Sequence, residues 1–212
     1  MRSLSITVSP GGITNLEQAL VGIANGAARA LESAINETLR WAKTHLTQTM
    51  HEVQPTLSLA NIEEVISIDQ VAADGSLTGV LSLSYKREPL ADFHAAFRKG
   101  SGVTVTTVAE MGPHHFKRMF RGSLGIGEIV ERDIEAAKRV PMIGRYAGRT
   151  INRGPRRGQP VLRQPLRVAY GTPVLTAFEN TPGVMETSVQ QIRDYFDDRV
   201  AANVDLLLGK TV

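Results

Sequence analysis

The chain has 212 residues, 42% of them hydrophobic, which is enough for one compact domain with a buried core. It contains no cysteine, which excludes a disulfide scaffold and thiolate metal sites and is compatible with a reducing cytosol. The net charge of +3 permits contact with nucleic acid without requiring it. No apolar run approaches the roughly 20 residues of a membrane helix. The N-terminus lacks the apolar core of a signal peptide, so we expect a soluble, unsecreted protein that does not contact a membrane.

The strongest helical signal lies in the first quarter of the chain. Apolar side chains from Leu16 to Met50 follow one another at steps of three and four residues, which is the spacing of one helical face. This pattern predicts one long helix over residues 15–52, and Pro55 ends it. Small residues between positions 22 and 28 give the first half of this helix little side-chain bulk, so a neighbouring element of the monomer or another subunit could approach it closely.

After this helix, apolar and polar residues alternate one by one, which is the spacing typical of β-strands. Residues 65–68 and 77–85 read as two strands, and Asp74-Gly75 between them is a common hairpin turn pair. The β-branched run at residues 102–108 predicts a third strand, and residues 114–120 predict a fourth. These four strands predict a small antiparallel sheet.

The second half of the chain contains two further helical patterns and one further strand pattern. Residues 128–139 have helical spacing, and residues 161–168 are predicted to pair with the sheet. A last helix follows Thr181-Pro182 and ends near Gly209. We expect the apolar faces of the first and last helices to pack on one face of the sheet as the core.

Strands bracketed by helices, without βαβ alternation, predict the α+β class. The predicted architecture is a long N-terminal helix and a C-terminal helix packed on a small antiparallel β-sheet, with an extended arginine-rich loop or arm. The predicted parts of this single domain, residues 1–212, are the helix 15–52, the sheet core 62–122, an inserted arm or loop 123–160, and the final strand and helix 161–212.

Residues 139–178 form the most unusual segment of the chain. These forty residues contain eight arginines and no lysine, aspartate or glutamate. Arginine grips phosphate or carboxylate with a planar fork and stays charged in any environment. Glycines and prolines interrupt the segment, which favours loop and short strand over helix. We therefore expect it to contact nucleic acid or an acidic partner, most directly through Arg145, Arg149, Arg153, Arg156, Arg157 and Arg163.

Patterns for catalysis or metal binding are weak in this sequence. Glu110, His114 and His115 are the best metal candidates, but adjacent histidines on a strand point to opposite faces of a sheet. Ser123 lies between glycines without the G-x-S-x-G spacing of a nucleophile elbow. We therefore predict no catalytic residues, no bound metal and no cofactor.

Several short motifs follow one another in an order that is typical of one family. Pro89-Leu90-Ala91-Asp92-Phe93 leads through a basic stretch into Gly102-Val103-Thr104-Val105, residues 116–120 precede Arg121-Gly122, and residues 158–166 precede Ala169-Tyr170-Gly171-Thr172-Pro173-Val174. In these motifs the chain resembles minor tail protein Z, the tail completion or neck protein family of lambda-like long-tailed phages, over roughly residues 16–208. It departs from the family in two ways: residues 123–154 are longer than the usual hairpin, and Thr172 stands where proline or serine is commoner.

The resemblance implies a structural virion protein, located in the tail or neck and in the host cytoplasm during assembly, with no enzymatic activity. It implies a homo-oligomeric ring, hexameric by analogy, that joins the tail to the head and helps to position the DNA end. The implied partners are other copies of the chain, neighbouring neck, tail terminator or tail tube proteins, and duplex DNA in the lumen.

Two other functions stay open on the residues alone. A non-specific nucleic-acid-binding protein would use the same arginines against backbone phosphates. A metal-assisted enzyme would use Glu110, His114 and His115. Strong duplex affinity of the isolated protein would favour the first alternative, and stoichiometric bound metal would favour the second.

Overall fold

The computed structural model describes residues 2–7, 10–73, 76–98, 101–121, 129–132, 139–141, 149–151, 154–163 and 166–209. Its described helices and antiparallel sheets give the predicted α+β class. The internal contacts divide the chain into two compact units. Unit 1 comprises Met1–Lys86 and Pro173–Val212, and unit 2 comprises Arg87–Thr172. No described helix is long and apolar enough to pass through a membrane.

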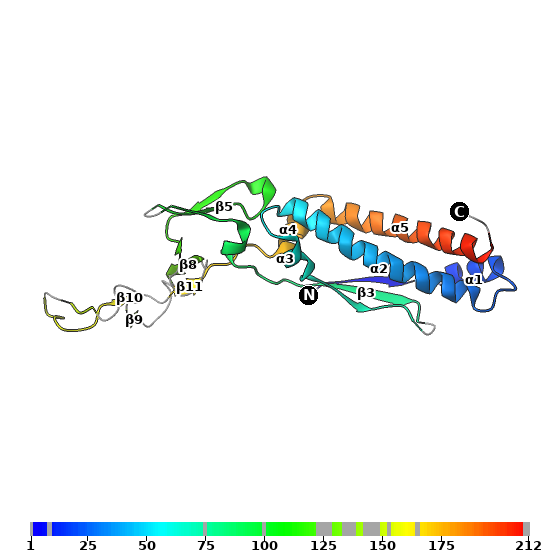
Figure 1. Cartoon of the computed structure of the whole chain (residues 1–212), viewed down its shortest axis with the longest axis horizontal. Coiled ribbons are helices and arrows are strands. Elements are labelled where there is room, and N and C mark those ends of the chain that lie inside the picture. The colour runs from blue at the N-terminus through cyan, green and yellow to red at the C-terminus, as the bar shows by residue number, and fades with distance from the viewer. Residues whose placement is uncertain are drawn as a thin grey trace. The chain divides into compact units, whose positions relative to one another are not determined.

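Two long helices and a three-stranded sheet dominate unit 1. The helices α2 (Gly26–Val53) and α5 (Val184–Leu207) lie side by side (Figure 1). Beneath them the strands follow the order β1-β3-β2, all antiparallel. The remaining bounds in this unit are β1 Arg2–Thr7, α1 Pro10–Ala19, α3 Leu59–Glu63, β2 Ile66–Gln70, β3 Thr78–Leu83 and α4 Val174–Asn180.

The helix α2 supplies most of the core of unit 1, as its sequence pattern predicts. Its buried face runs from Ala27 to Val53 and includes Leu31, Ile35 and Leu39, each at most 1% exposed. The strand β3 can lie close to this face because Gly79 has no side chain. A Cβ atom at that position would lie 2.6 Å from Cγ2 of Ile35 and 2.8 Å from Cδ1 of Leu39.

The prediction of one continuous helix over residues 15–52 is wrong, because α1 ends at Ala19 and α2 begins at Gly26. Gly22 (φ 94°) and Asn25 (φ 54°) adopt left-handed backbone conformations, which interrupt a right-handed helix. The apolar spacing survives the interruption because side chains on both sides of it join one cluster. That cluster contains Leu16, Leu20, Ile23, Ala27, Ala30, Val204 and Leu207.

The predicted hairpin of unit 1 is confirmed, and a third strand joins it. The strands β2 and β3 pair with Ile66 opposite Leu83. On the other side of β3, β1 pairs with Leu4 opposite Leu81, which the sequence reading did not predict. The alternation of Leu4 and Ile6 with polar residues was the signal that could have identified this strand.

Short strands and single helical turns build unit 2. Its sheets have the orders β4-β5-β6, β11-β8-β7 and β10-β9. The bounds are η1 Leu90–Phe93, β4 Ala96–Arg98, β5 Gly102–Val105, η2 Ala109–Met111, β6 His114–Phe116, β7 Phe120–Arg121, β8 Ile129–Arg132, β9 Val140–Pro141, β10 Leu162–Arg163 and β11 Leu166–Val168.

Phe93 is the central side chain of the small core of unit 2. It is fully buried, and a Cβ atom at Gly171 would lie only 2.4 Å from its ring. Two backbone hydrogen bonds join the beginning of the unit to its end: Leu90 N–H donates to Ala169 O at 2.8 Å, and Gly171 N–H donates to Glu88 O at 2.9 Å. The ends of this segment are therefore fixed beside each other.

Four predicted elements of the second half differ in the structure. The predicted helix at residues 128–139 is wrong at its start, because Ile129–Arg132 form β8 between β7 and β11. The fourth predicted strand is two short strands, β6 and β7, and the final strand at 161–168 is likewise two, β10 and β11. The last helix begins at Val184 rather than at Pro182, and α4 precedes it.

Candidate arginine-rich contact surface

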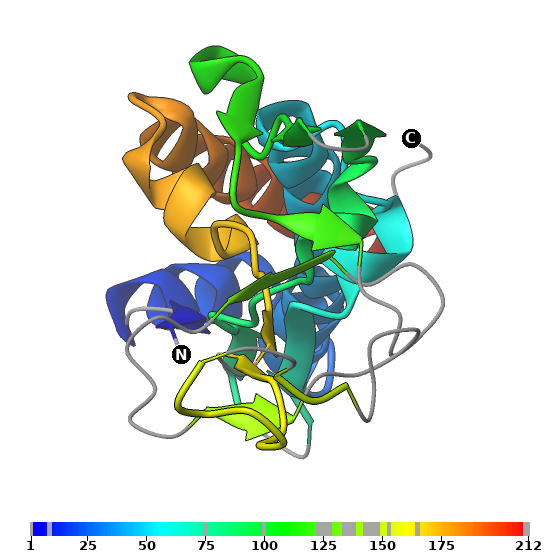
Figure 2. The same cartoon turned by 90° about the vertical axis from the view of Figure 1, so that its left-hand side faces the viewer.

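The described part of the predicted contact segment forms an irregular β-hairpin. Within β9 and β10, Arg163 pairs with Val140. Farther along the same ribbon, Val161 N–H donates to Arg149 O at 2.9 Å, and Ile151 N–H donates to Gln159 O at 2.9 Å. We call residues 149–151 and 154–163 the arginine hairpin (yellow in Figure 2).

A turn at residues 154–158 closes the arginine hairpin. Arg157 N–H donates to Gly154 O at 3.0 Å, and Gly158 N–H donates back across the ribbon to Ile151 O at 2.9 Å. Gly154 (φ 81°) and Gly158 (φ 85°) supply the left-handed conformations that this turn requires. The sequence therefore places Arg156 and Arg157 at the turn of a hairpin that backbone hydrogen bonds hold closed.

The structure describes some of the predicted contact residues and not others. Arg145 and Arg153 lie outside the described residues, and Arg163 lies on β10. Arg149 is exposed beside the turn, as are Arg156 and Arg157 within it. The described segments thus bring Arg149, Arg156 and Arg157 into one hairpin.

The turn of the hairpin is exposed and carries uncompensated positive charge. Residues 154–160 are all exposed. The side chains of Arg156 and Arg157 make no hydrogen bond or ion pair with any described residue. Charged guanidinium groups without an internal partner remain available to phosphate or carboxylate groups of another molecule.

Unit 2 contains a second arginine cluster, which the sequence reading missed. A hollow of about 400 Å³ is lined by Arg118, Phe120, Glu131, Arg132 and Arg167, and we call it the arginine hollow. The pairing of β8 with β11 places Glu131 directly opposite Arg167, and the Arg167 Nε to Glu131 Oε1 distance is 2.7 Å.

The structure does not bring the candidate metal ligands together into one site. His114 and His115 are exposed on β6, and Glu110 lies on η2. His115 Nδ1 lies 3.0 Å from Oγ1 of Thr104, whereas the ring of His114 lies 6.5 Å from that of Phe116. Among the residues that the structure describes, no three His, Asp or Glu side chains are placed to hold a metal ion. The predicted serine candidate, Ser123, lies outside the described residues.

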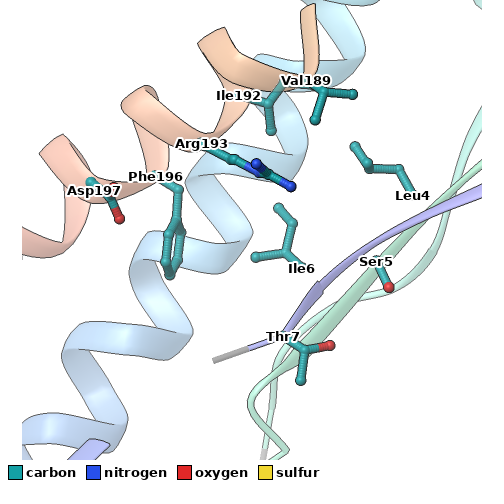
Figure 3. A pocket seen from close by; sticks show the side chains of 9 residues that line it. All are labelled: Leu4, Ser5, Ile6, Thr7, Val189, Ile192, Arg193, Phe196 and Asp197. Carbon is teal, nitrogen blue, oxygen red and sulfur yellow. The ribbon is translucent and has the colours of Figure 1, made fainter. Parts of the chain in front are cut away.

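Unit 1 contains an apolar groove between β1 and α5 (Figure 3). Leu4 and Ile6 of β1 point toward α5, while Ser5 and Thr7 alternate with them along the strand. The volume of the groove is about 380 Å³. Its full lining is Leu4, Ser5, Ile6, Thr7, Val189, Ile192, Arg193, Phe196 and Asp197.

This groove leaves the apolar face of α5 only partly covered. Ile192 is buried at 4% exposure, whereas Val189 and Phe196 are half-buried. The expectation that the whole face of the last helix is core is therefore met only in part. The one arginine and one aspartate of the lining, Arg193 and Asp197, are both exposed, so the groove does not hold a buried acid–base pair.

Comparison with models of protein families, with curated proteins and with solved structures finds no match to this chain. The geometry of the two arginine clusters and the motifs of the sequence are therefore what indicate a function for this chain.

Proposed function

We propose that this chain is a structural subunit of the head–tail junction of a long-tailed phage, of the tail completion or neck type. In this role it forms a homo-oligomeric ring that joins the tail to the head, and it catalyses no reaction. The observation that carries the proposal is the arginine hairpin, in which Arg156 and Arg157 are exposed and have no described internal partner. The motif resemblance supplies the location, and the hairpin supplies a surface suited to contact.

Ring assembly requires a heterologous interface, in which one surface of a subunit meets a different surface of the next. A backbone-bonded hairpin with an arginine turn suits one side of such an interface, because its guanidinium groups can bind a carboxylate or phosphate in a fixed geometry. We propose neighbouring copies, adjacent neck, terminator or tube proteins, and duplex DNA in the lumen as partners of the assembled ring. The assembled protein would be found in the virion.

A charge-reversal experiment tests this function. Arg156→Glu together with Arg157→Glu should either abolish incorporation of the protein into particles or leave assembled particles with a misplaced DNA end. Loss of assembly places the hairpin at a protein interface, and misplaced DNA places it at the lumen. Arg193 is an exposed arginine on α5, and Arg193→Glu is the matched control. It should leave both incorporation into particles and the position of the DNA end unchanged.

Electron cryo-microscopy of the native particle gives the direct test. Rotationally symmetric density for this chain at the neck supports the proposal. Particles that assemble normally without the protein, or turnover of a substrate by the purified protein, would contradict it.

A second function, non-specific binding of nucleic acid by the isolated protein, is favoured by one specific observation. The arginine hollow adds a separate cluster of cations to the hairpin within the same unit. Isolated monomers that bind duplex DNA tightly and never form rings would support this function over the structural one.

A further inference from the structure

The arginine hollow is assembled from three chain segments that are distant in sequence. Arg132 ends β8, and Arg167 comes from the neighbouring strand β11. Arg118 belongs to a tight turn before β7, in which Met119 N–H donates to Phe116 O at 3.4 Å. The hollow is therefore a product of the fold rather than of a local run of basic residues.

The described residues that line the hollow carry an excess of positive charge. Three of them are arginines, and Glu131 is the single carboxylate among them. Glu131 is committed to Arg167 at 2.7 Å, whereas Arg118 and Arg132 have no hydrogen bond or ion pair with a described residue. Cations that line one hollow repel one another, and a bound anion lowers that repulsion.

We propose that the arginine hollow binds a phosphate group. Arginine donates pairs of parallel hydrogen bonds to phosphate oxygens, and several arginines can share the oxygens of one phosphate. The ion pair with Glu131 engages Nε of Arg167 and fixes the orientation of its planar guanidinium group. Glu131 thus positions one cation while its own negative charge weakens the attraction for the anion.

The phosphate group comes either from the backbone of duplex DNA or from a free phosphate compound. Both sources present unesterified phosphate oxygens that accept hydrogen bonds from arginine, so the hollow by itself recognises their shared chemistry. The proposal is independent of ring formation, because a monomer contains all the residues of the hollow. A negative result for assembly and a negative result for phosphate binding are therefore distinguishable.

Binding measurements on the full-length chain test the proposal. Titration with inorganic phosphate, followed by calorimetry, should give saturable binding. Titration with a short mixed-sequence DNA duplex, followed by fluorescence anisotropy across a range of salt, tests whether the DNA backbone supplies the phosphate. Arg118→Gln with Arg132→Gln should lower the affinity for phosphate about tenfold or more, because charge-assisted hydrogen bonds are lost. If the phosphate belongs to DNA, the slope of log affinity against log salt should become shallower by about 0.9 for the one contact removed.

Glu131→Gln separates a binding site from a merely structural cluster. Removal of this carboxylate should raise the affinity for phosphate several-fold, because the negative charge that opposes the anion is gone. A structural ion pair would instead give unchanged or weaker binding. Arg193→Gln, which removes an exposed arginine of unit 1, is the matched control and should change neither titration.

The single substitution Arg118→Gln guards against misfolding of the double variant, because Arg118 is an exposed turn residue outside the strand pairs. It should also weaken phosphate binding. Binding of phosphate but not of DNA supports the site and identifies a free compound as the source. Binding of both, with the affinity for DNA also lowered by Arg118→Gln, identifies the DNA backbone. Equal phosphate affinity in the wild-type protein and both arginine variants overturns the proposal, as does binding of an acidic peptide without any binding of phosphate.

Discussion

Unit 1 and unit 2 differ in how their buried and charged side chains are distributed. In unit 1 one helix, α2, presents a buried face along its whole length to α5 and to the sheet. In unit 2 the described buried side chains, such as Phe93, Val103 and Ile129, come from a helical turn and several short strands, and those strands also carry exposed arginines. We therefore expect unit 1 to contain most of the folding free energy, and we expect the exposed arginines of unit 2 to make the charge-dependent contacts.

The two units also differ in the kind of surface that they leave open. The groove of unit 1 is lined by Leu4, Ile6, Ile192 and other residues, and three of the five described residues that line the arginine hollow of unit 2 are arginines. An apolar groove gains free energy by excluding water, whereas a cationic hollow is sensitive to salt. Experiments that separate the two units should therefore separate stability from charge-dependent binding.

The largest expected effect comes from truncation of the central side chain of unit 2. Phe93→Ala should cost about 3–5 kcal/mol of the stability of that unit, because a fully buried ring is replaced by a cavity. Amide hydrogen exchange in β5 should accelerate strongly. Trp41, the single tryptophan of the chain, lies in unit 1, and the urea midpoint of its fluorescence should change little.

Phe97→Ala provides the control for this experiment. Phe97 also belongs to unit 2, but it is 43% exposed, so its removal should have a much smaller effect on exchange in β5. An equal shift of the Trp41 transition and of the exchange in β5 after Phe93→Ala would show that the units unfold together. The division of stability between the units would then be wrong.

Truncation of the core of unit 1 should have the opposite pattern. Leu39 is 1% exposed on α2, and Leu39→Ala should destabilise unit 1 by about 2–5 kcal/mol. The urea midpoint of Trp41 fluorescence should fall accordingly. Arg40→Ala changes the next, exposed residue of the same helix and should alter stability by less than about 0.5 kcal/mol.

The sequence was informative where structure depends on local spacing. The apolar face of α2 and the β2–β3 hairpin were predictable because each arises from residues close together in the chain. The break between α1 and α2 was missed because Gly22 and Asn25 redirect the backbone without interrupting the apolar spacing. Apolar periodicity predicts which side chains share one helical face, but it does not predict every turn between them.

Non-local pairing explains the larger errors. Ile129 and Val130 were assigned to a helix, but β8 is the central strand of its sheet, where neighbouring residues on both faces can be buried. The arginine hollow depends on the same pairing, since the residues that line it lie on or next to β7, β8 and β11, which come together only in the folded sheet. The cations of the arginine hairpin were easier to find because they lie within one short stretch of sequence, residues 149–163.

A smaller effect is expected from the aromatic stack between α2 and α5. The ring of Trp41 is stacked on that of Tyr195, with centroids 4.4 Å apart and planes at 5°. Tyr195→Leu keeps an apolar side chain but removes the stack, and should cost about 0.5–1.5 kcal/mol. Urea unfolding followed by Trp41 fluorescence measures this loss. Tyr170→Leu makes the same change at an exposed site of unit 2 and should leave the urea midpoint of Trp41 fluorescence unchanged.

The smallest expected effect concerns Asp69 on β2. Hydrogen bonds donated by the hydroxyl groups of Ser82 and then Ser67 hold the pKa of this carboxyl below its usual range. A lowered pKa means that the native state favours the ionised form, so this stabilisation is fully present above the unfolded pKa. It is lost as the pH falls through the lowered native pKa.

Asp69→Asn should therefore make the stability of unit 1 depend less on pH at the acidic end. Near neutrality, the pH dependence of its stability should change little. Urea midpoints from Trp41 fluorescence across an acidic pH series measure this effect. Asp198→Asn on α5 is the matched control, because the Asp198 side chain makes no hydrogen bond or ion pair with a described residue. Glu64, whose pKa is lowered by Lys86, titrates in the same direction and is left unchanged in both variants. Identical acid dependence in the wild-type protein and Asp69→Asn would mean that the two serine hydroxyl groups bind this carboxylate no better than water does.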